Sequence, residues 1–371
     1  MVDLYGQYLD IKEEVQAGFE EVFKSCWFIN GPAVKAFSSE LADYLNVSHV
    51  TACGNGTDAL QIALMALGLK PGDEVITTAF TFVATAEVIA LLGLNPVFVE
   101  IDERTFNIDA NKIEAAITPK TKCIIPVHLY GQSSDMGKIM KIAKRHQLYV
   151  VEDNAQAIGA DYTFSDGTVR KTGAIGDIGC TSFYPSKNLG AYGDAGAVFS
   201  NNPDLGEKIH VMANHGQREK YVSAEVGINS RLDSFQAVVL RAKLKKLDAY
   251  IAARQKAADA YDAAFKDHPK LLTPLRALNS THVFHQYTLT VDGDRDKLRA
   301  LLQEKGIPSM VYYPIPLHMQ EAYKQYGYKA GDLPITERLC NQVISLPMHT
   351  ELDNEQLNYI IETFLGCLRQ I

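Results

Sequence analysis

One aspartate and one lysine carry the clearest chemical signal in the sequence. Asp153 follows the apolar run 148–152, and Lys187 follows a second run, 180–184, in a turn. A lysine amine can form an imine with an aldehyde, and a carboxylate can keep a pyridine nitrogen protonated so that the ring accepts electrons. Pyridoxal phosphate needs both groups. The pair therefore indicates a site for this cofactor.

Each of the two residues also has an ordinary explanation, because aspartates often cap turns and helices and lysines are mostly solvated. The surroundings of Lys187 favour a chemical role, since the small residues of 188–196 permit the close approach of a ligand. Partial desolvation would make its amine easier to deprotonate. Asp153 ends a predicted parallel strand, where open α/β sheets bind ligands. Side chains alternate along a strand, so Glu152 and Asp153 cannot both face one site.

The segment Gly54–Leu60 is a candidate phosphate site. Gly54 and Gly56 precede a predicted helix, so backbone N–H groups can point at an anion whose charge the helix dipole favours. An N-capped helix with a tight entry turn explains the same residues without a ligand. The segment lacks the spacing GxGxxG, which argues against a dinucleotide.

Short β-rich runs alternate with helix-period segments through the first 200 residues. This pattern is typical of βαβ units around a mainly parallel sheet, and it predicts an α/β fold. The predicted strands cover 75–79, 96–101, 122–127, 148–152, 180–184 and 196–200, and the predicted helices cover 57–68, 83–93, 111–117 and 135–146.

The last third of the chain predicts a smaller α+β unit. Apolar residues at helical spacing predict a linking helix over about 233–266, with Asp233 as its N-cap. A strand over 283–291, a helix over 295–305 and a strand over 309–313 follow.

The length of 371 residues suits a large domain, 1–245, and a small domain, 246–371. The net charge of −8 argues against a nucleic-acid partner. The six cysteines lack the spacing of a zinc site, so we expect no metal and mostly buried, reduced thiols. No signal peptide or membrane span is recognisable, so we expect a soluble cytoplasmic protein.

From residue 30 to residue 349 the chain resembles the nucleotide-sugar aminotransferases of the DegT/StrS type. These are fold type I pyridoxal-phosphate enzymes, whose fold is like that of aspartate aminotransferase. The segments that carry the resemblance are GNGTDAL at 54–60, TFVATAE at 81–87, PVHLYGQ at 126–132, VEDNAQAIGA at 151–160, FYPSKNLGAYGDAGA at 183–197, HGQ at 215–217, NSRLD at 229–233 and YPIPLH at 313–318.

The resemblance implies roles around the cofactor ring. Lys187 would carry the imine and shuttle the proton between the cofactor and the sugar carbon. Asp153 would pair with the pyridine nitrogen, and Gln156 would lie against the ring near its hydroxyl. Phe82 would stack on the opposite face, although an aromatic residue here also suits an apolar core.

The resemblance also implies how the cofactor phosphate is held. Gly56, Thr57 and Ser182 would bind it within one chain, although Ser182 also suits an ordinary strand hydroxyl. Asn229 would reach the phosphate of a neighbouring subunit, which implies a homodimer with shared active sites. Without the resemblance, 227–230 is equally a simple turn.

Within the family, the sequence is most similar to enzymes that aminate C3 of UDP-2-acetamido-2-deoxy-3-oxo-glucuronate for bacterial surface polysaccharides such as O-antigen. The implied amino donor is L-glutamate, in two half-reactions. Arg231 could pair bidentately with the uronate carboxylate, although an arginine here resembles much of the wider family. Tyr312, Tyr313 and His318 complete the expected substrate contacts.

Tyr312 departs from the uronate enzymes, which usually have a histidine before the Tyr-Pro pair. A phenol cannot become a cation near neutral pH. This difference favours a neutral sugar, such as a dTDP-linked 3-keto- or 4-keto-6-deoxyhexose. Tyr312 equally suits a strand position facing the core of the small domain.

Two functions of other kinds stay open at this point. Some relatives dehydrate sugars with a histidine in place of the lysine, and Lys187 argues against that chemistry. Some regulatory proteins of related sequence sense sugars or cofactors without turnover. His128, His215 and His349 have no assigned role and suit structural hydrogen bonds.

Overall fold

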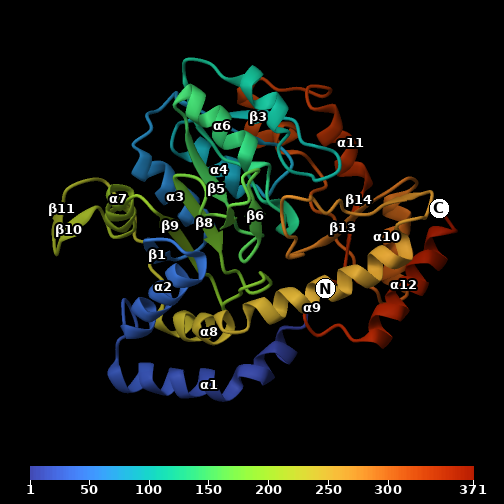
Figure 1. Cartoon of the computed structure of the whole chain (residues 1–371), viewed down its shortest axis with the longest axis horizontal. Coiled ribbons are helices and arrows are strands. Elements are labelled where there is room, and N and C mark those ends of the chain that lie inside the picture. The colour runs from blue at the N-terminus through green and yellow to red at the C-terminus, as the bar shows by residue number, and fades with distance from the viewer.

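Seven strands form one central sheet in the computed structural model, which describes residues 1–371 (Figure 1). They are β1 (His49–Cys53), β2 (Glu74–Thr78), β3 (Asn95–Val99), β4 (Thr121–Ile124), β5 (Tyr149–Asp153), β8 (Ile178–Ser182) and β9 (Gly196–Ser200), in the order β1-β9-β8-β5-β4-β2-β3. Neighbours from β8 to β3 are parallel, whereas β9 is antiparallel to both β8 and β1. The predicted α/β fold is confirmed, and only β1 lies outside the predicted strands.

Helices cover both faces of this sheet (Figure 1). They are α3 (Gly56–Leu67), α4 (Ala84–Leu91) and α7 (Pro203–Ala213) on one face, and α5 (Ala110–Ile113) and α6 (Met136–His146) with α2 (Pro32–Leu45) on the other. Adjacent residues of β5 enter the two layers, because Val151 packs with α3 and Val150 packs with α6. The predicted helix 111–117 is the short α5 followed by the 3-10 turn η1 (Glu114–Ala116).

The predicted single helix over 233–266 is wrong. The chain forms α8 (Ser234–Leu244) and α9 (Leu247–Phe265), and the junction contains a tighter bond from the Lys246 N–H to the Lys243 carbonyl. Lys245 and Lys246 pair there with carboxylates of the N-terminal helix α1 (Leu4–Ser25). No glycine or proline marks the break, so the local sequence does not signal it. Asp233 occupies the N-cap position of α8, but its side chain makes no capping bond.

A second sheet lies in the last third of the chain. Its strands are β12 (Leu271–Leu272), β13 (Tyr287–Val291) and β14 (Val343–Leu346), all antiparallel, and α9, α10 (Arg295–Glu304) and α12 (Asn354–Leu368) complete its own apolar core. The helix expected over 295–305 is present. The strand expected over 309–313 is wrong, because only Met310 bridges to β14 before the chain turns toward the large sheet. The domain division between 245 and 246 stays a prediction.

The remaining elements are short. They are the hairpins β6 (Asp161–Thr163) with β7 (Val169–Lys171) and β10 (Gln217–Glu219) with β11 (Val222–Ser223), the helix α11 (Pro334–Gln342), and the 3-10 turns η2 (Leu129–Gly131), η3 (Leu317–Met319) and η4 (Glu321–Tyr326). The β10–β11 hairpin projects from the body of the molecule (Figure 1). None of the helices combines the length and apolar character that a membrane crossing requires. Five of the six cysteines are buried, and Cys26 is exposed.

Candidate active site

The backbone of Asp153, at the carboxyl end of β5, forms hydrogen bonds through both its N–H and its carbonyl. Its N–H donates to the Pro126 carbonyl at 3.0 Å, and the His128 N–H donates to its carbonyl at 3.0 Å. Thr85 Oγ1 donates to Asp153 Oδ2 at 2.7 Å, and the Ala155 N–H donates to Oδ1 at 3.2 Å. Each carboxylate oxygen has more than one lone pair, so the oriented group can still accept a further donor.

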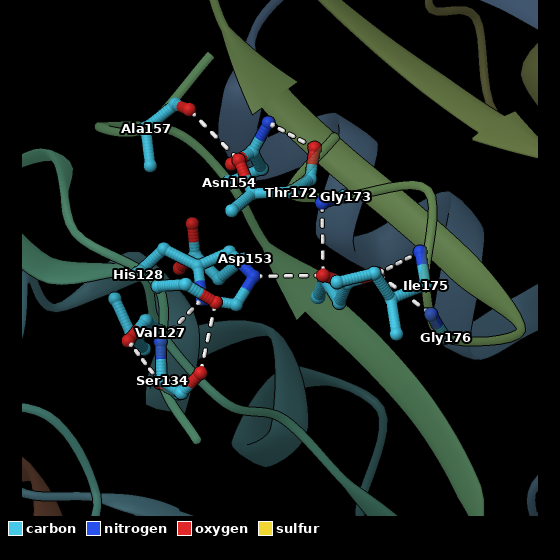
Figure 2. Close-up of polar contacts among 12 residues, drawn as sticks. Val127, His128, Ser134, Asp153, Asn154, Ala157, Thr172, Gly173, Ile175 and Gly176 are labelled. Atoms are coloured by element: carbon cyan, nitrogen blue, oxygen red, sulfur yellow. Dashed lines mark hydrogen bonds and ion pairs between the residues drawn. The ribbon is translucent and has the colours of Figure 1, made fainter. Parts of the chain in front are cut away.

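Glu152, the preceding residue of β5, is fully buried and faces the other side of the strand. Figure 2 shows the groups that surround its carboxylate, His128, Gly173, Ile175 and Gly176. The Glu152 carboxylate accepts three backbone N–H groups at 2.6 to 2.8 Å, from Gly173, Ile175 and Gly176. His128 Nδ1 accepts the Ser134 N–H at 3.1 Å, which leaves Nε2 to donate to Glu152 at 2.8 Å. The two acids thus face opposite sides, as the alternation of side chains requires, and His128 has a structural bond.

Lys187 lies in the loop from β8 to β9. Its backbone N–H donates to the Tyr184 carbonyl at 2.8 Å, and Asn188 Nδ2 donates to the Val283 carbonyl at 2.8 Å. Burial lowers the pKa of Lys187 to about 8, and the negative charge of Asp153 opposes this fall. An amine with such a pKa exchanges its proton near neutral pH, as a general acid and base must. The two residues therefore belong to one site.

Gly56, Thr57 and Ser182 gather where α3 begins beside the end of β8. Asn55 caps the helix by accepting the Asp58 N–H at 2.8 Å, and the N–H groups of Gly56 and Thr57 have no partner within the chain. A Cβ atom on Gly56 would lie 2.6 Å from the Ser182 Cβ, so only glycine allows this approach. Free N–H groups at a helix N-terminus, with a hydroxyl beside them, fit a phosphate.

Gln156, Tyr313 and Phe82 form one wall near Asp153. Gln156 Oε1 accepts the Tyr130 N–H at 2.7 Å, and Gln156 Nε2 donates to the Tyr313 hydroxyl at 3.1 Å. The rings of Tyr313 and Phe82 have centroids 6.3 Å apart. Phe82 is 55% exposed, which is not a core position. Burial, together with the Asp153 charge, raises the pKa of Tyr313, so its phenol stays neutral.

Asn229 and Arg231 lie beside the entry to α3. Ser230, between them, accepts the Gly54 N–H at 2.9 Å and donates to Asp58 at 2.6 Å. Asn229 is exposed. Arg231 lines an open cavity of about 550 Å³ between α7 and the β10–β11 hairpin. The other lining residues are Glu207, His210, Val211, Asn214, His215, Gln217, Arg218, Glu219, Lys220 and Tyr221. None of the residues near Asp153 lines this cavity.

The remaining two expected substrate residues have different surroundings. Tyr312 is half-buried, and its carbonyl accepts the Tyr130 hydroxyl. His318 is 1% exposed, and its Nε2 is 3.1 Å from Glu337 Oε1. The ring has almost no accessible surface in this structure, and the predicted contact of His318 with the substrate stays a prediction. Its bond to Glu337 ties η3 to α11.

Thr85 and Tyr130 belong to the site although we did not single them out from the sequence. Thr85 bonds the Asp153 carboxylate, and Tyr130 bonds Gln156 through its N–H and the Tyr312 carbonyl through its hydroxyl. A buried threonine and a buried tyrosine carry no chemical signal by themselves. Their places in 81–87 and 126–132 are the one sequence feature that could have pointed to them.

Comparison with known proteins identifies the chain. The family model described as the DegT/DnrJ/EryC1/StrS aminotransferase family matches residues 9–365. The chain belongs to this family. A pleiotropic regulatory protein of Geobacillus stearothermophilus is 48% identical over 98% of this aminotransferase and 96% of that protein. A UDP-2-acetamido-2-deoxy-3-oxo-D-glucuronate aminotransferase of Pseudomonas aeruginosa is 45% identical over 97% of each chain. A dTDP-3-amino-3,4,6-trideoxy-α-D-glucose transaminase of Streptomyces venezuelae is 38% identical over 97% and 94%.

Solved structures match the aminotransferase over 97 to 100% of its length. DesV of S. venezuelae, in complex with a ketimine intermediate, has a TM-score of 0.95 at 37% identity and covers 100% of this chain and 98% of its own. NtdA of Bacillus subtilis, with bound cofactor PMP, has a TM-score of 0.89 at 36% identity and covers 97% and 82%. The predicted family, enzyme class and cofactor are confirmed: the chain is a pyridoxal-phosphate-dependent sugar aminotransferase.

The residues of this aminotransferase fit the cofactor. The N–H groups at the start of α3 are unpaired, Gly56 leaves room beside Ser182, and the exposed ring of Phe82 lies near Tyr313. When bound, pyridoxal phosphate supplies an electron-accepting ring and carries the amino group between the two substrates.

Proposed function

We propose that this aminotransferase moves the amino group of L-glutamate to C3 of UDP-2-acetamido-2-deoxy-3-oxo-glucuronate, for a surface polysaccharide such as O-antigen. One observation carries the proposal. A lysine whose pKa falls to about 8 lies within electrostatic reach of a buried carboxylate, in a chain 45% identical to an aminotransferase named for this sugar.

The roles of the residues follow from their chemistry. Lys187 would hold the cofactor and then take and return the proton at the reacting carbons, which its lowered pKa permits. Asp153 would accept a hydrogen bond from the protonated ring nitrogen. Gln156 and Phe82 would orient the ring, and the phosphate would lie at the start of α3 against Gly56, Thr57 and Ser182. Glutamate and sugar would use this site in turn, in two half-reactions.

The proposal includes a homodimer with shared active sites. Asn229 is exposed beside α3, and Arg231 lines a cavity separate from the residues near Asp153. Residues in these positions could contact a ligand in the active site of a neighbouring subunit as well as in that of their own chain. Arg231 would then pair bidentately with the uronate carboxylate, and Tyr312 and Tyr313 would contact the sugar.

A dTDP-linked 3-keto- or 4-keto-6-deoxyhexose is the second candidate substrate. Tyr312 favours it, because a neutral phenol offers no positive charge to a uronate. A transaminase named for a dTDP-linked deoxysugar is 38% identical to this chain, which is close to the value for the uronate enzyme.

The test is a two-step titration of the protein reconstituted with pyridoxal phosphate. The visible spectrum is recorded before and after L-glutamate, and each ketosugar is then added separately. Loss of the visible band with glutamate, and its return with the UDP-uronate alone, supports the proposal. Return with the dTDP-deoxysugar alone supports the second candidate. A band that glutamate never changes would contradict the proposal and favour a regulatory role, the role for which the Geobacillus relative is named.

Variants of the open cavity test the sugar assignment separately. Arg231→Lys keeps the charge but removes the planar fork, so we expect a higher KM for the uronate with kcat nearly unchanged. Arg218→Lys is the matched control, because Arg218 lines the same cavity but pairs with Glu207 at 2.5 Å. Equal KM values for the two variants would argue against a carboxylate partner for Arg231.

A further inference from the structure

The orientation of the Asp153 carboxylate depends on one buried hydroxyl. Thr85 is the second residue of α4, has no exposed surface, and donates from Oγ1 to Asp153 Oδ2 at 2.7 Å. The other oxygen, Oδ1, accepts the Ala155 N–H at the longer distance of 3.2 Å. The terminal torsion of an aspartate is broad and nearly two-fold, so its rotation is set by such donors. Thr85 provides the shorter bond.

The charge of the Asp153 carboxylate determines which group donates in each hydrogen bond of the Thr85 hydroxyl. An ionised carboxylate only accepts, so the Thr85 hydroxyl must give its proton to Asp153. The Thr81 hydroxyl, 3.3 Å from that of Thr85, must then donate to the Thr85 oxygen. Both threonines are buried, and a donor chain in a dry environment strengthens its last bond. A hydroxyl bond to a charged acceptor is among the stronger hydrogen bonds.

Thr85 also belongs to the turn that carries Phe82. The Thr85 N–H donates to the Phe82 carbonyl at 3.3 Å. Thr85 therefore forms hydrogen bonds both with the backbone of Phe82, whose ring is exposed, and with the carboxylate of Asp153. The backbone of Asp153 is held independently by Pro126 and His128. Removal of the Thr85 hydroxyl would thus leave the carboxylate with only the longer bond from the Ala155 N–H while the strand stays in place.

We propose that Thr85 is a positioning residue of the transamination: its hydroxyl holds the Asp153 carboxylate in the direction that meets the protonated ring nitrogen of the cofactor. The inference rests on the proposed role of Asp153. It makes Thr85 a determinant of cofactor affinity and of kcat, without direct contact between Thr85 and the sugar.

The substitution Thr85→Val tests the inference, because valine keeps the shape and removes only the hydroxyl. We expect it to weaken the binding of pyridoxal phosphate to the apoprotein by about tenfold, measured by a titration of the visible absorbance. We also expect a lower kcat and an unchanged KM for the sugar. Thr85→Ser keeps the donor and should bind the cofactor like the wild type.

Thr77→Val is the matched control. Thr77 is equally buried and donates to the Ile125 carbonyl at 2.9 Å, but it does not touch Asp153. Thr77→Val loses one buried hydroxyl bond and Thr85→Val loses two, so both variants should lose thermal stability, Thr85→Val more than Thr77→Val. A purely structural role for Thr85 predicts that both variants bind pyridoxal phosphate equally well, and that result would overturn the inference. Thr85→Ala, with the same expected loss of affinity, replaces Thr85→Val if the valine variant does not fold.

Asp153→Asn distinguishes an error in the role of Thr85 from an error in the role of Asp153. If Asp153→Asn binds pyridoxal phosphate weakly and Thr85→Val binds it normally, only the role of Thr85 is rejected. Normal cofactor binding by Asp153→Asn would reject the role of Asp153, and the inference would fall with it. Weak binding by both variants, with Thr77→Val unaffected, is the outcome we expect.

Discussion

Lys243 of α8 is a buried cation without a carboxylate partner, and its replacement should stabilise the protein. The side chain is 1% exposed. Its Nζ is 3.4 Å from Gln7 Oε1 of α1 and 4.6 Å from the centre of the Tyr192 ring. Burial lowers the pKa of Lys243 from 10.5 to about 8. The folded protein therefore disfavours the charged form.

The size of the effect follows from this shift. A fall from 10.5 to about 8 corresponds to about 3 kcal/mol of unfavourable free energy when the lysine is charged in both states. Lys243→Met removes that penalty and keeps an unbranched apolar side chain. It also removes the contact with the Tyr192 ring, which is worth about 1 kcal/mol or somewhat more. We expect a net gain of about 1 to 2 kcal/mol in the free energy of unfolding at neutral pH.

The pH dependence has a definite sign. Below about pH 8 the lysine is charged in both states and the penalty is fully present; it disappears as the pH rises from about 8 to 10.5, the ordinary value. The advantage of Lys243→Met should therefore shrink over this range. Lys187 titrates in the same range, but it is common to both proteins and cancels in the difference.

Urea unfolding at several pH values measures the difference. Lys245→Met is the control, because Lys245 is an exposed neighbour that pairs with Glu14 and should gain nothing when replaced. A Lys243→Met protein that is less stable than the wild type at pH 7 would refute the reasoning. A gain that does not change with pH would refute it equally, since the cause would then not be the buried charge.

Three further predictions concern the active site and its support. Lys187→Ala should abolish amine transfer from glutamate while the protein stays folded, as followed by absorbance and circular dichroism; normal turnover would reject the mechanism. Gly56→Ala should weaken cofactor binding at least tenfold in an absorbance titration, because its Cβ would lie 2.6 Å from that of Ser182; unchanged binding would contradict a phosphate site there. Glu152→Ala should lower the free energy of unfolding in urea by about 3 kcal/mol or more, because it leaves three backbone N–H groups and His128 without their acceptor; a loss below about 1 kcal/mol would show that water replaces the carboxylate.

The large sheet was predictable because its signals are local. Apolar β-rich runs mark β5 and β8, and the residues that follow them, Asp153 and Lys187, lie in one site as the ends of parallel strands should. The alternation of side chains predicted that only one of two adjacent acids faces that site. The hydrogen bonds of Glu152 on the far side of β5 agree.

The errors arose where distant contacts decide the local structure. The break between α8 and α9 falls at Lys245 and Lys246, whose carboxylate partners lie in α1, more than 200 residues earlier in the chain. The segment 309–313 has a strand composition, but it crosses to Tyr130 instead of continuing along β14. Thr85 could not be identified for the same reason, because its partner Asp153 is 68 residues away.

The placement of the site residues explains how related enzymes can share a cofactor and differ in sugar. Asp153 ends a strand and Gly56 begins a helix, and both are constrained by packing or hydrogen bonds within the sheet layers. Arg231 and Tyr312 lie in irregular segments outside any named helix or strand. Changes in such segments disturb the core little, whereas changes at the strand ends would disturb the proposed cofactor contacts. Shared chemistry with different sugars is therefore the expected outcome at 38 to 45% identity, and the sugar must be identified by direct titration.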